Sequence, residues 1–217
     1  MLAAEEGASD MANEKDRAVT ASDDEAAQEA ALAGLVRALS SRSRKDRQNS
    51  AHVIAQIAEG SADRLVPHID ALVEALSCPE AQTRWETMTA LTSLAVVRPD
   101  VAEKAAEAAE ECLYDEESGM LRFVSFRFFS KLAGADHARS RAVWPLLDEA
   151  LQCYHGDQEF PGMLDCIVDM LQTGDVDQTV REKIADRMRF DAGNGKNPLA
   201  SRSRKIVDLC EAGADGE

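Results

Sequence analysis

The chain has 217 residues, of which 45% are hydrophobic but only 5% aromatic, and its formal net charge at pH 7 is −16. This length suffices for one ordinary domain or one short array of repeats, and the apolar content suffices for a sizeable core. The acidic balance disfavours nucleic acid as a partner, because binding a phosphate backbone requires a dense local cluster of Lys and Arg. Alanine and leucine dominate and few stretches alternate apolar with polar residues, so the composition indicates an all-helical protein.

The five cysteines lie at positions 78, 112, 153, 166 and 210, and no two of them have C-x-x-C spacing. An odd count on predicted helices indicates reduced thiols rather than a disulfide framework. No apolar run approaches the roughly 20 residues of a membrane-spanning helix. The acidic N-terminus also lacks the apolar core of a signal peptide. We therefore expect a cytoplasmic protein without membrane contact.

Residues 1–24 are rich in Ala, Glu, Asp, Ser and Asn, and they nearly lack large apolar side chains. Such a segment cannot bury enough surface to offset the entropy lost on ordering, so we expect a disordered acidic tail. Met11 is an alternative start. We expect a second disordered tail over residues 213–217, which leaves residues 25–212 as the ordered domain.

One helical template recurs five times within that domain. Its small or apolar residues fall three, six, seven and ten positions after a reference residue, which is the spacing of one helix face. The second copy begins at Arg84 and places Thr87, Ala90, Leu91 and Leu94 at those positions. The reference position recurs at 47, 84, 122, 161 and 200, so that successive copies are 37 to 39 residues apart. A period in this range indicates stacked helical hairpins.

Further apolar stripes precede each copy, at residues 32–39, 65–76, 101–113, 143–151 and 180–188. Each hairpin is then helix A, a turn, helix B and a second turn. Neighbouring hairpins must stack, because a single pair cannot bury its apolar faces alone. Four glycines follow the template by two or three residues, where glycine can close a helix in the left-handed conformation: Gly60, Gly134, Gly174 and Gly213.

The run from Leu65 to Leu76, a short turn and the copy beginning at Arg84 resemble a HEAT repeat. The family pattern has a proline in helix A, here Pro67, and an arginine early in helix B, here Arg84. The run Trp144-Pro145-Leu146-Leu147 repeats the helix A feature, whereas Pro161 and Ala200 replace the arginine in the last two copies.

The resemblance covers roughly residues 25–212. It implies an all-α protein, a right-handed α-α superhelix of the armadillo-like solenoid class. About five hairpins would form this solenoid, and their B helices would line its concave side.

The template also predicts which residues face the concave surface. If positions three, six, seven and ten face the core, positions one, four, five and eight lean toward the concave side. Aromatic and arginine side chains there favour partner binding, because they bury much area with few rotatable bonds. The alternative is that the rings pack between adjacent repeats. The predicted partner-binding residues are Trp85, Thr89, Phe123, Phe126, Arg127, Asp165 and Asp169.

Arg47, Arg84 and Arg122 occupy the reference position of the first three copies. A cation early in a helix opposes the helix dipole, so each arginine needs a compensating partner. Glu80, four residues before Arg84, is the partner that the spacing predicts. We expect a ladder that joins the repeats, and ligand binding is the alternative.

We find no catalytic constellation, because the four histidines fall in different predicted repeats and none lies beside a nucleophile motif. The spacing of metal-capable side chains from Cys153 to Glu159 matches no zinc signature, so we expect no metal. Residues 191–198 lack the Gly-Lys-Ser/Thr ending of a phosphate loop, and we expect no cofactor. The sequence Ser-Arg-Ser-Arg-Lys occurs at 41–45 and again at 201–205. Solvated helix starts explain both copies, and an anion or nucleic-acid contact is the alternative.

The resemblance to HEAT repeats predicts the fold specifically but says little about activity, because proteins with this scaffold have many unrelated functions. We expect a non-enzymatic interaction or scaffold module that binds a protein or peptide on its concave face. The alternative is a HEAT-like DNA glycosylase acting on alkylated bases, a class that uses concave tryptophans, an aspartate and a basic surface. Here Thr89 rather than an acid lies one turn after Trp85. A third alternative is an accessory role for a cofactor-carrying protein.

Overall fold

The computed structural model describes residues 24–196 and 198–212, and all regular structure in these residues is helical. The predicted tails and Gly213 lie outside the described residues, except that residue 24 already belongs to the first helix. None of the described helices is both long and apolar enough to cross a bilayer. After a first helix over residues 24–38, the elements are α2 (Arg44–Ser61), η1 (Ala62–His68), α3 (Ile69–Ala75), α4 (Ala81–Val97), α5 (Pro99–Ala102), η2 (Glu103–Ala105), α6 (Ala106–Leu113), α7 (Gly119–Ala133), α8 (His137–Cys153), α9 (Phe160–Thr173), α10 (Gln178–Asn194) and α11 (Leu199–Ala212).

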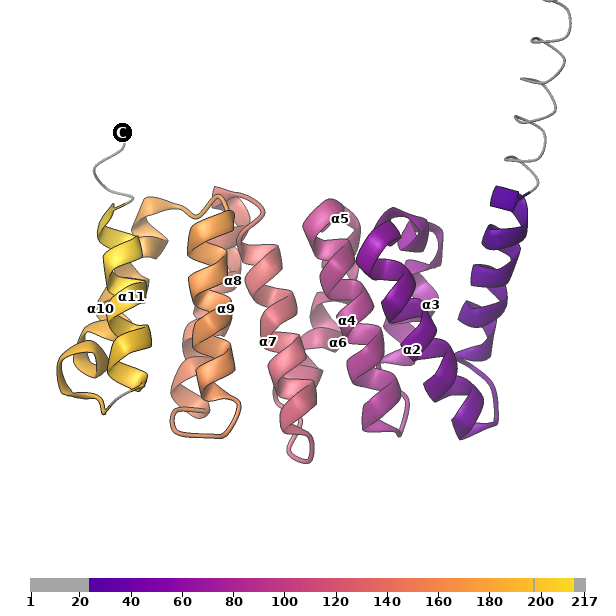
Figure 1. The fold of residues 1–217 in the computed structure, drawn as a ribbon, viewed down its shortest axis with the longest axis horizontal. Coiled ribbons are helices and arrows are strands. Elements are labelled where there is room, and N and C mark those ends of the chain that lie inside the picture. The colour runs from indigo at the N-terminus through magenta and orange to yellow at the C-terminus, as the bar shows by residue number, and fades with distance from the viewer. Residues whose placement is uncertain (1–23, 197, 213–217) are drawn as a thin grey trace, which may run out of the picture.

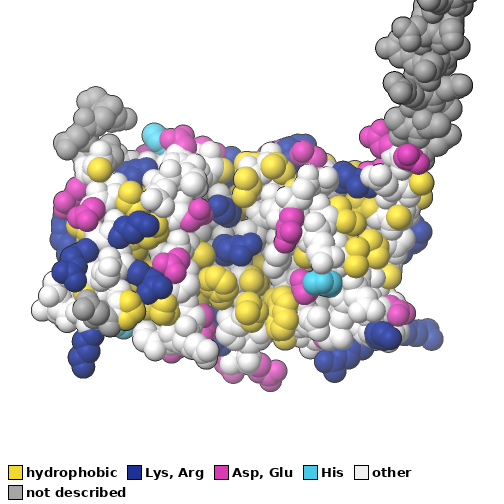
Figure 2. Space-filling model, in the orientation of Figure 1, with side chains coloured by type: hydrophobic (Ala, Val, Ile, Leu, Met, Phe, Trp, Pro, Cys, Tyr) yellow, Lys and Arg dark blue, Asp and Glu magenta, His cyan; other side chains and the backbone are white. Residues whose placement is uncertain are grey.

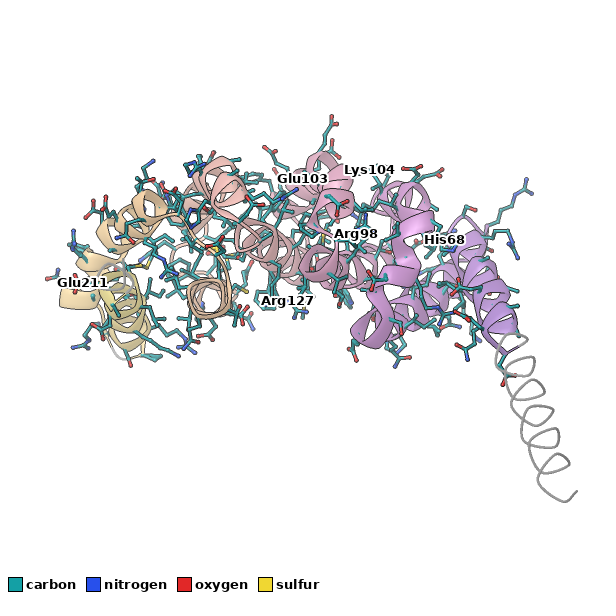
Figure 3. All side chains as sticks on the ribbon, turned by 90° about the horizontal axis from the view of Figure 1, so that it is seen from above. His68, Arg98, Glu103, Lys104, Arg127 and Glu211 are labelled. Carbon is teal, nitrogen blue, oxygen red and sulfur yellow. The ribbon has the colours of Figure 1, made fainter. Side chains whose placement is uncertain are left out.

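These elements form five hairpins in a row (Figure 1). The first members, namely residues 24–38, η1–α3, α5–η2–α6, α8 and α10, make an outer layer. The second members, α2, α4, α7, α9 and α11, make an inner layer in which each helix packs against the next. Seen from above, the row bends into an arch, and the inner layer lines its hollow side (Figure 3). The all-α superhelix expected from the sequence is confirmed.

The template positions form the core. Leu91, Phe129 and Val168, which share position seven, are 0%, 3% and 7% exposed. Val53 in the first copy is an exception at 37% exposed, because α2 is the first of the inner-layer helices that the structure describes and none of them covers its outward side. The apolar period of the sequence therefore identifies the buried face of every inner helix but overestimates burial at the end of the row.

The glycines near the helix ends do not act as predicted. Gly60, Gly134 and Gly174 all lack a positive φ, which among the described residues occurs only at Gly156. Gly134 and Gly174 instead let two successive turns touch. The Asp175 amide donates to the Gly134 carbonyl at 2.8 Å, and a Cβ on Gly174 would lie 2.7 Å from the Gly134 Cα. The physical reason for these two glycines is close backbone approach rather than left-handed geometry.

In each of the first three hairpins, an arginine binds the turn between its two helices to the corresponding turn of the next hairpin. Arg47, Arg84 and Arg122 each donate one hydrogen bond to a backbone carbonyl of their own turn and another to a carboxylate of the following hairpin. The carbonyls belong to Ser41, Leu76 and Asp115, at 2.6, 2.9 and 2.9 Å. The carboxylates belong to Glu80, Asp115 and Glu159, at 3.0, 2.7 and 2.7 Å. We call these three contacts the arginine ladder.

The ladder confirms that the arginines join repeats, but the predicted pairing of Glu80 with Arg84 is wrong. Glu80 precedes α4 in extended backbone conformation, and its carboxylate binds Arg47 of the preceding hairpin instead. The partner of Arg84 is Asp115. Helical spacing did not apply, because Glu80 lies outside the helix that contains Arg84.

Replacing Gly174 with alanine should lower the free energy of unfolding by about 1–3 kcal/mol, the usual cost of an extra methyl group in a packed contact. The new Cβ would lie 2.7 Å from the Cα and O of Gly134, which are backbone atoms and cannot rotate away. Urea unfolding followed by circular dichroism measures the change. Gly60→Ala is the matched control, because nothing lies within 4 Å of its Cβ position. Equal midpoints for the two variants would contradict the close approach.

The ladder should also make stability depend on pH. The hydrogen bond from Arg47 lowers the pKa of Glu80 below its usual 4.5, and it outweighs the opposing effect of burial. A carboxylate whose pKa is lower in the folded chain stabilises the fold above its unfolded pKa, and this stabilisation is lost as the pH falls through the folded pKa. We expect Arg47→Gln to lose less stability than the wild type as the pH falls below about 4.5.

Urea midpoints at a series of pH values from about 6 to about 3 test this expectation. Arg37→Gln is the control, because Arg37 is exposed and forms no ion pair with a described residue. Identical acid slopes for the wild type and Arg47→Gln would rule out the coupling between Arg47 and Glu80.

Candidate functional site

Hydrophobic side chains gather over the first turns of α4 and α7 on the face that lines the hollow (Figure 2). Met120 is 51% exposed there, and Trp85 and Phe123 are partly buried against the core. Each ring is followed one turn later by a polar residue, Thr89 on α4 and Arg127 on α7. The inner layer therefore presents one row of apolar side chains and, one helical turn away, a row of polar side chains. We call the five residues together the ring patch: Trp85, Thr89, Met120, Phe123 and Arg127.

Phe126 is a correction to the predicted surface, because it is fully buried and cannot contact a partner. Position four of the template is also buried in the two preceding copies, at Ala51 and Met88. In α9 the same position carries Asp165, which is exposed. Position four therefore points between inner helices in the first three hairpins and becomes accessible only farther along the row.

Phe123 belongs both to the surface and to the contact between repeats. A Cβ on Gly162 would lie 2.8 Å from the Phe123 Cε2 atom, so the ring rests directly on the backbone of α9. Beside it is a surface hollow of about 420 Å³ lined by Gly119, Met120, Phe123, Gln158, Glu159 and Gly162. The two roles that the sequence left open for the ring, binding and inter-repeat packing, are thus compatible at this residue.

Arg127 points from α7 into the hollow of the arch (Figure 3). Asp169 pairs with Lys131 and Asp165 pairs with Arg202, and Arg127 forms no ion pair within the described residues. The Cys166 thiol on the neighbouring helix is neutral, because burial raises its pKa to about 12 although Arg127 opposes this rise. Arg127 is therefore a positive charge on the inner layer that no carboxylate of the described residues pairs with.

Two polar groups near the ring patch are bonded within the chain. Thr89 Oγ1 donates to the Trp85 carbonyl at 2.9 Å. Glu86 lies 3.0 Å from the His52 Nδ1 atom of the preceding hairpin. Thr89 is bonded to its own helix, whereas Glu86 is bonded to a residue of the preceding hairpin. The spacing of residues within one repeat cannot predict a partner in another repeat.

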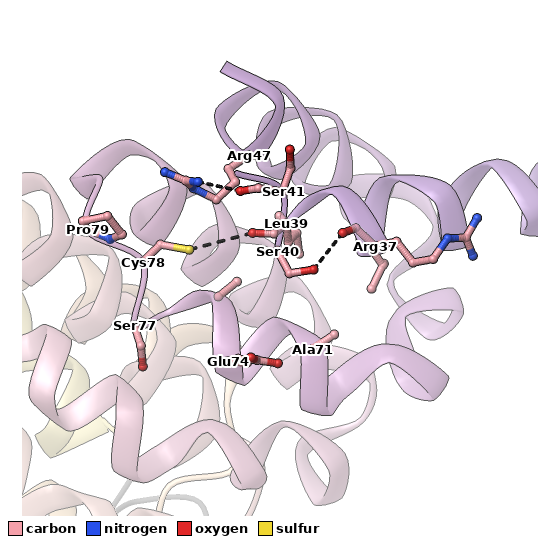
Figure 4. Close-up of a pocket in the computed structure, with 12 residues that line it drawn as sticks. Arg37, Leu39, Ser40, Ser41, Arg47, Ala71, Glu74, Ser77, Cys78 and Pro79 are labelled. Atoms are coloured by element: carbon pink, nitrogen blue, oxygen red, sulfur yellow. Dashed lines mark hydrogen bonds between the residues drawn. The ribbon is translucent and has the colours of Figure 1, made fainter. Parts of the chain in front are cut away.

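A second hollow, of about 570 Å³, lies between the first helix and α3 (Figure 4). Its wall includes Leu39, Ala71 and Pro79, together with Cys78, whose Sγ faces the Leu39 carbonyl at 3.9 Å. Burial raises the pKa of the Cys78 thiol, which favours the unreactive protonated form. This hollow offers space but no activated group.

The segment from Cys153 to Glu159 makes contacts with the neighbouring helices. His155 Nε2 lies 3.0 Å from Asp191 Oδ2, and its ring packs beside Phe160 at 4.9 Å between centroids. Glu159 belongs to the arginine ladder. Across residues 24–196 and 198–212, no three His, Cys, Asp or Glu side chains converge in a way that could hold a metal ion.

The sequence matches no protein-family model and no curated protein. Its fold does match solved structures. A designed armadillo repeat protein in complex with the peptide (KR)4 superposes with a TM-score of 0.67 and 15% identity over 83% of this chain and 82% of that chain. Computationally designed armadillo repeat proteins for modular peptide recognition give 0.64 and 15% over the same shares. Another engineered protein gives 0.66 and 13% over 84% of this chain and 80% of that chain.

These likenesses show that the chain has the armadillo-like α-solenoid fold anticipated from its repeats. The identities are low, so the match applies to the architecture and to nothing further.

The exposure of Trp85 can be checked by fluorescence quenching, because the chain has only two tryptophans. Trp144 is 4% exposed, whereas Trp85 is partly accessible on the inner layer. We expect acrylamide to quench the Trp144→Phe variant, which reports Trp85, more strongly than the Trp85→Phe variant, which reports Trp144. Equal quenching constants would place the Trp85 ring inside the core.

Proposed function

We propose that this chain is a repeat scaffold that binds a protein or peptide segment in the hollow of the arch, across the ring patch of α4 and α7. The observation that carries the proposal is the incomplete cover of Trp85 and Phe123 in a chain that buries most of its other large apolar side chains. Large rings with a nearby arginine are the groups that most often dominate binding energy at protein interfaces.

Rigidity of the surface supports the same proposal. Phe123 is held against Gly162, and the inner helices that carry the patch are fastened by the arginine ladder. A preformed surface loses little side-chain entropy on binding, so more of the contact energy remains as affinity. Two of the structurally similar proteins are a set of armadillo repeat proteins designed for peptide recognition and a designed armadillo repeat protein bound to a peptide.

The proposal gives the predicted residues different roles. Trp85 and Phe123 are the apolar anchors, and Thr89 offers mainly its methyl group because its hydroxyl is already bonded. Arg127, which forms no ion pair with a described residue, supplies a positive charge. Phe126 is buried and is not a contact residue in this proposal. Asp165 and Asp169, which are ion-paired within the chain, form a polar rim.

Selection from a random peptide display library against the whole chain tests the proposal. Peptides of about 12 residues span roughly 40 Å when extended, which matches five inner helices spaced about 10 Å apart. We expect Trp85→Ala to weaken binding of the selected peptides about 30-fold, the effect of losing a typical hot-spot ring, while the melting temperature stays near the wild-type value. Isothermal titration calorimetry and a thermal melt measure the two quantities.

Phe190→Ala is the matched control, because Phe190 is 73% exposed but belongs to α10 in the outer layer. It should leave affinity unchanged. Peptides that bind Trp85→Ala as tightly as the wild type would argue against the ring patch as the binding surface. Loss of folding in Trp85→Ala would show that the ring is core.

A further inference from the structure

We propose that the segment bound in the hollow is acidic, with Asp or Glu alternating with apolar residues. This inference rests on the function proposed above and adds the chemistry of the partner. It also runs against the overall charge of the chain, which is −16.

The part of this charge that the described helices carry is divided unequally between the two layers. The inner helices α2, α4, α7, α9 and α11 contain 10 Lys and Arg against 7 Asp and Glu, a net charge of +3. The outer helices, counted with residues 24–38, contain 9 Lys and Arg against 16 Asp and Glu, a net charge of −7. The inner helices are therefore less negative as a set than the outer helices, and a segment that enters the hollow meets the inner layer first.

Screening decides which layer dominates at the ring patch. The Debye length is about 8 Å at physiological ionic strength, whereas packed helix layers are about 10 Å apart. A charge in the outer layer therefore acts on the inner surface more weakly than a charge within the ring patch itself. The nearby groups, and Arg127 above all, set the local potential.

In this proposal a carboxylate of the partner pairs with Arg127, which has no ion-pair partner among the described residues. Asp165 and Asp169 face other cations, and Glu86 is bonded to His52. The ladder arginines Arg47, Arg84 and Arg122 already have carboxylate partners. An acidic side chain of the partner would give Arg127 the planar, charge-assisted contact for which guanidinium groups are suited.

The apolar and polar rows of the ring patch explain the alternation. Phe123 and Arg127 are one helical turn apart on α7, which is about 6 Å along the helix axis. An extended segment that crosses α4 and α7 directs successive side chains to opposite sides. Its apolar side chains then reach the apolar row, and the intervening side chains reach the polar row, which contains Arg127. A Lys or Arg at those intervening positions would meet Arg127 and be repelled.

The peptide selection described above also tests this inference. Among clones whose binding depends on Trp85, we expect Asp and Glu to be enriched over Lys and Arg. Arg127→Glu should weaken binding of a selected acidic peptide at least tenfold, and Arg127→Gln should weaken it less. Arg37→Glu is the matched control, because it changes the charge equally at an exposed residue of the outer layer, and it should leave affinity unchanged. Circular dichroism verifies that each variant is folded.

Two synthetic octapeptides give a second readout, (EL)4 as the acidic and apolar probe and (KR)4 as the basic one. We expect (EL)4 to bind the wild type more tightly than (KR)4, and Arg127→Glu to reduce this preference. Trp85-dependent peptides rich in Lys or Arg, or acidic peptides indifferent to Arg127→Glu, would overturn the acidic partner and leave the proposed function standing. A selection that yields no Trp85-dependent peptide would overturn both.

Discussion

Stacking of neighbouring hairpins is the constraint on which this molecule depends. Two helices cannot bury their apolar faces alone, so each hairpin completes its core only against the next. The apolar contact sets the distance between inner helices, and the arginine ladder sets which turns lie opposite one another. Each ladder guanidinium holds a carbonyl of its own turn and a carboxylate of the following hairpin. Arginine suits this task because its planar donors can engage both acceptors at once.

The ladder does not continue to the end of the row, and other contacts replace it. Pro161 and Ala200 stand where the fourth and fifth arginines would be. Near that end, Arg181 donates to the carbonyls of Leu171, Val176 and Leu209, at 3.3 Å in each case. The contact between the turns at Gly134 and Gly174 lies, like the contacts of Arg181, at the C-terminal ends of the inner helices. In the first half of the chain, neighbouring hairpins are thus joined through the turns that connect the two helices of one hairpin. In the second half, they are joined through the turns that connect one hairpin to the next.

The sequence was a reliable guide wherever one helix determines the outcome. Periodicity alone places Leu91, Phe129 and Val168 in the core, because an apolar face must be buried whatever it packs against. It failed where the outcome depends on a neighbouring repeat. The pairing of Glu80, the burial of Phe126 and the close approach of Gly174 all involve residues 31 or more positions away or the cover given by adjacent helices. The absence of an ion-pair partner for Arg127 among the described residues could not be predicted either, because it arises from the pairing of Asp165 and Asp169 with other cations. Whether these residues bind a partner stays a prediction.

Unequal charge on the two layers of described helices, +3 in the inner layer and −7 in the outer layer, amounts to an electric dipole across the row of hairpins, with its positive end at the hollow. A uniform net charge on this chain would only repel or attract an approaching charged macromolecule. A dipole on this chain also experiences a torque in the electric field of that macromolecule. An anionic molecule approaching from any direction would therefore tend to turn the arch until its mouth faces the visitor, before any contact forms. Orientation of this kind raises the fraction of encounters that are productive, and it fades as added salt shortens the reach of the field.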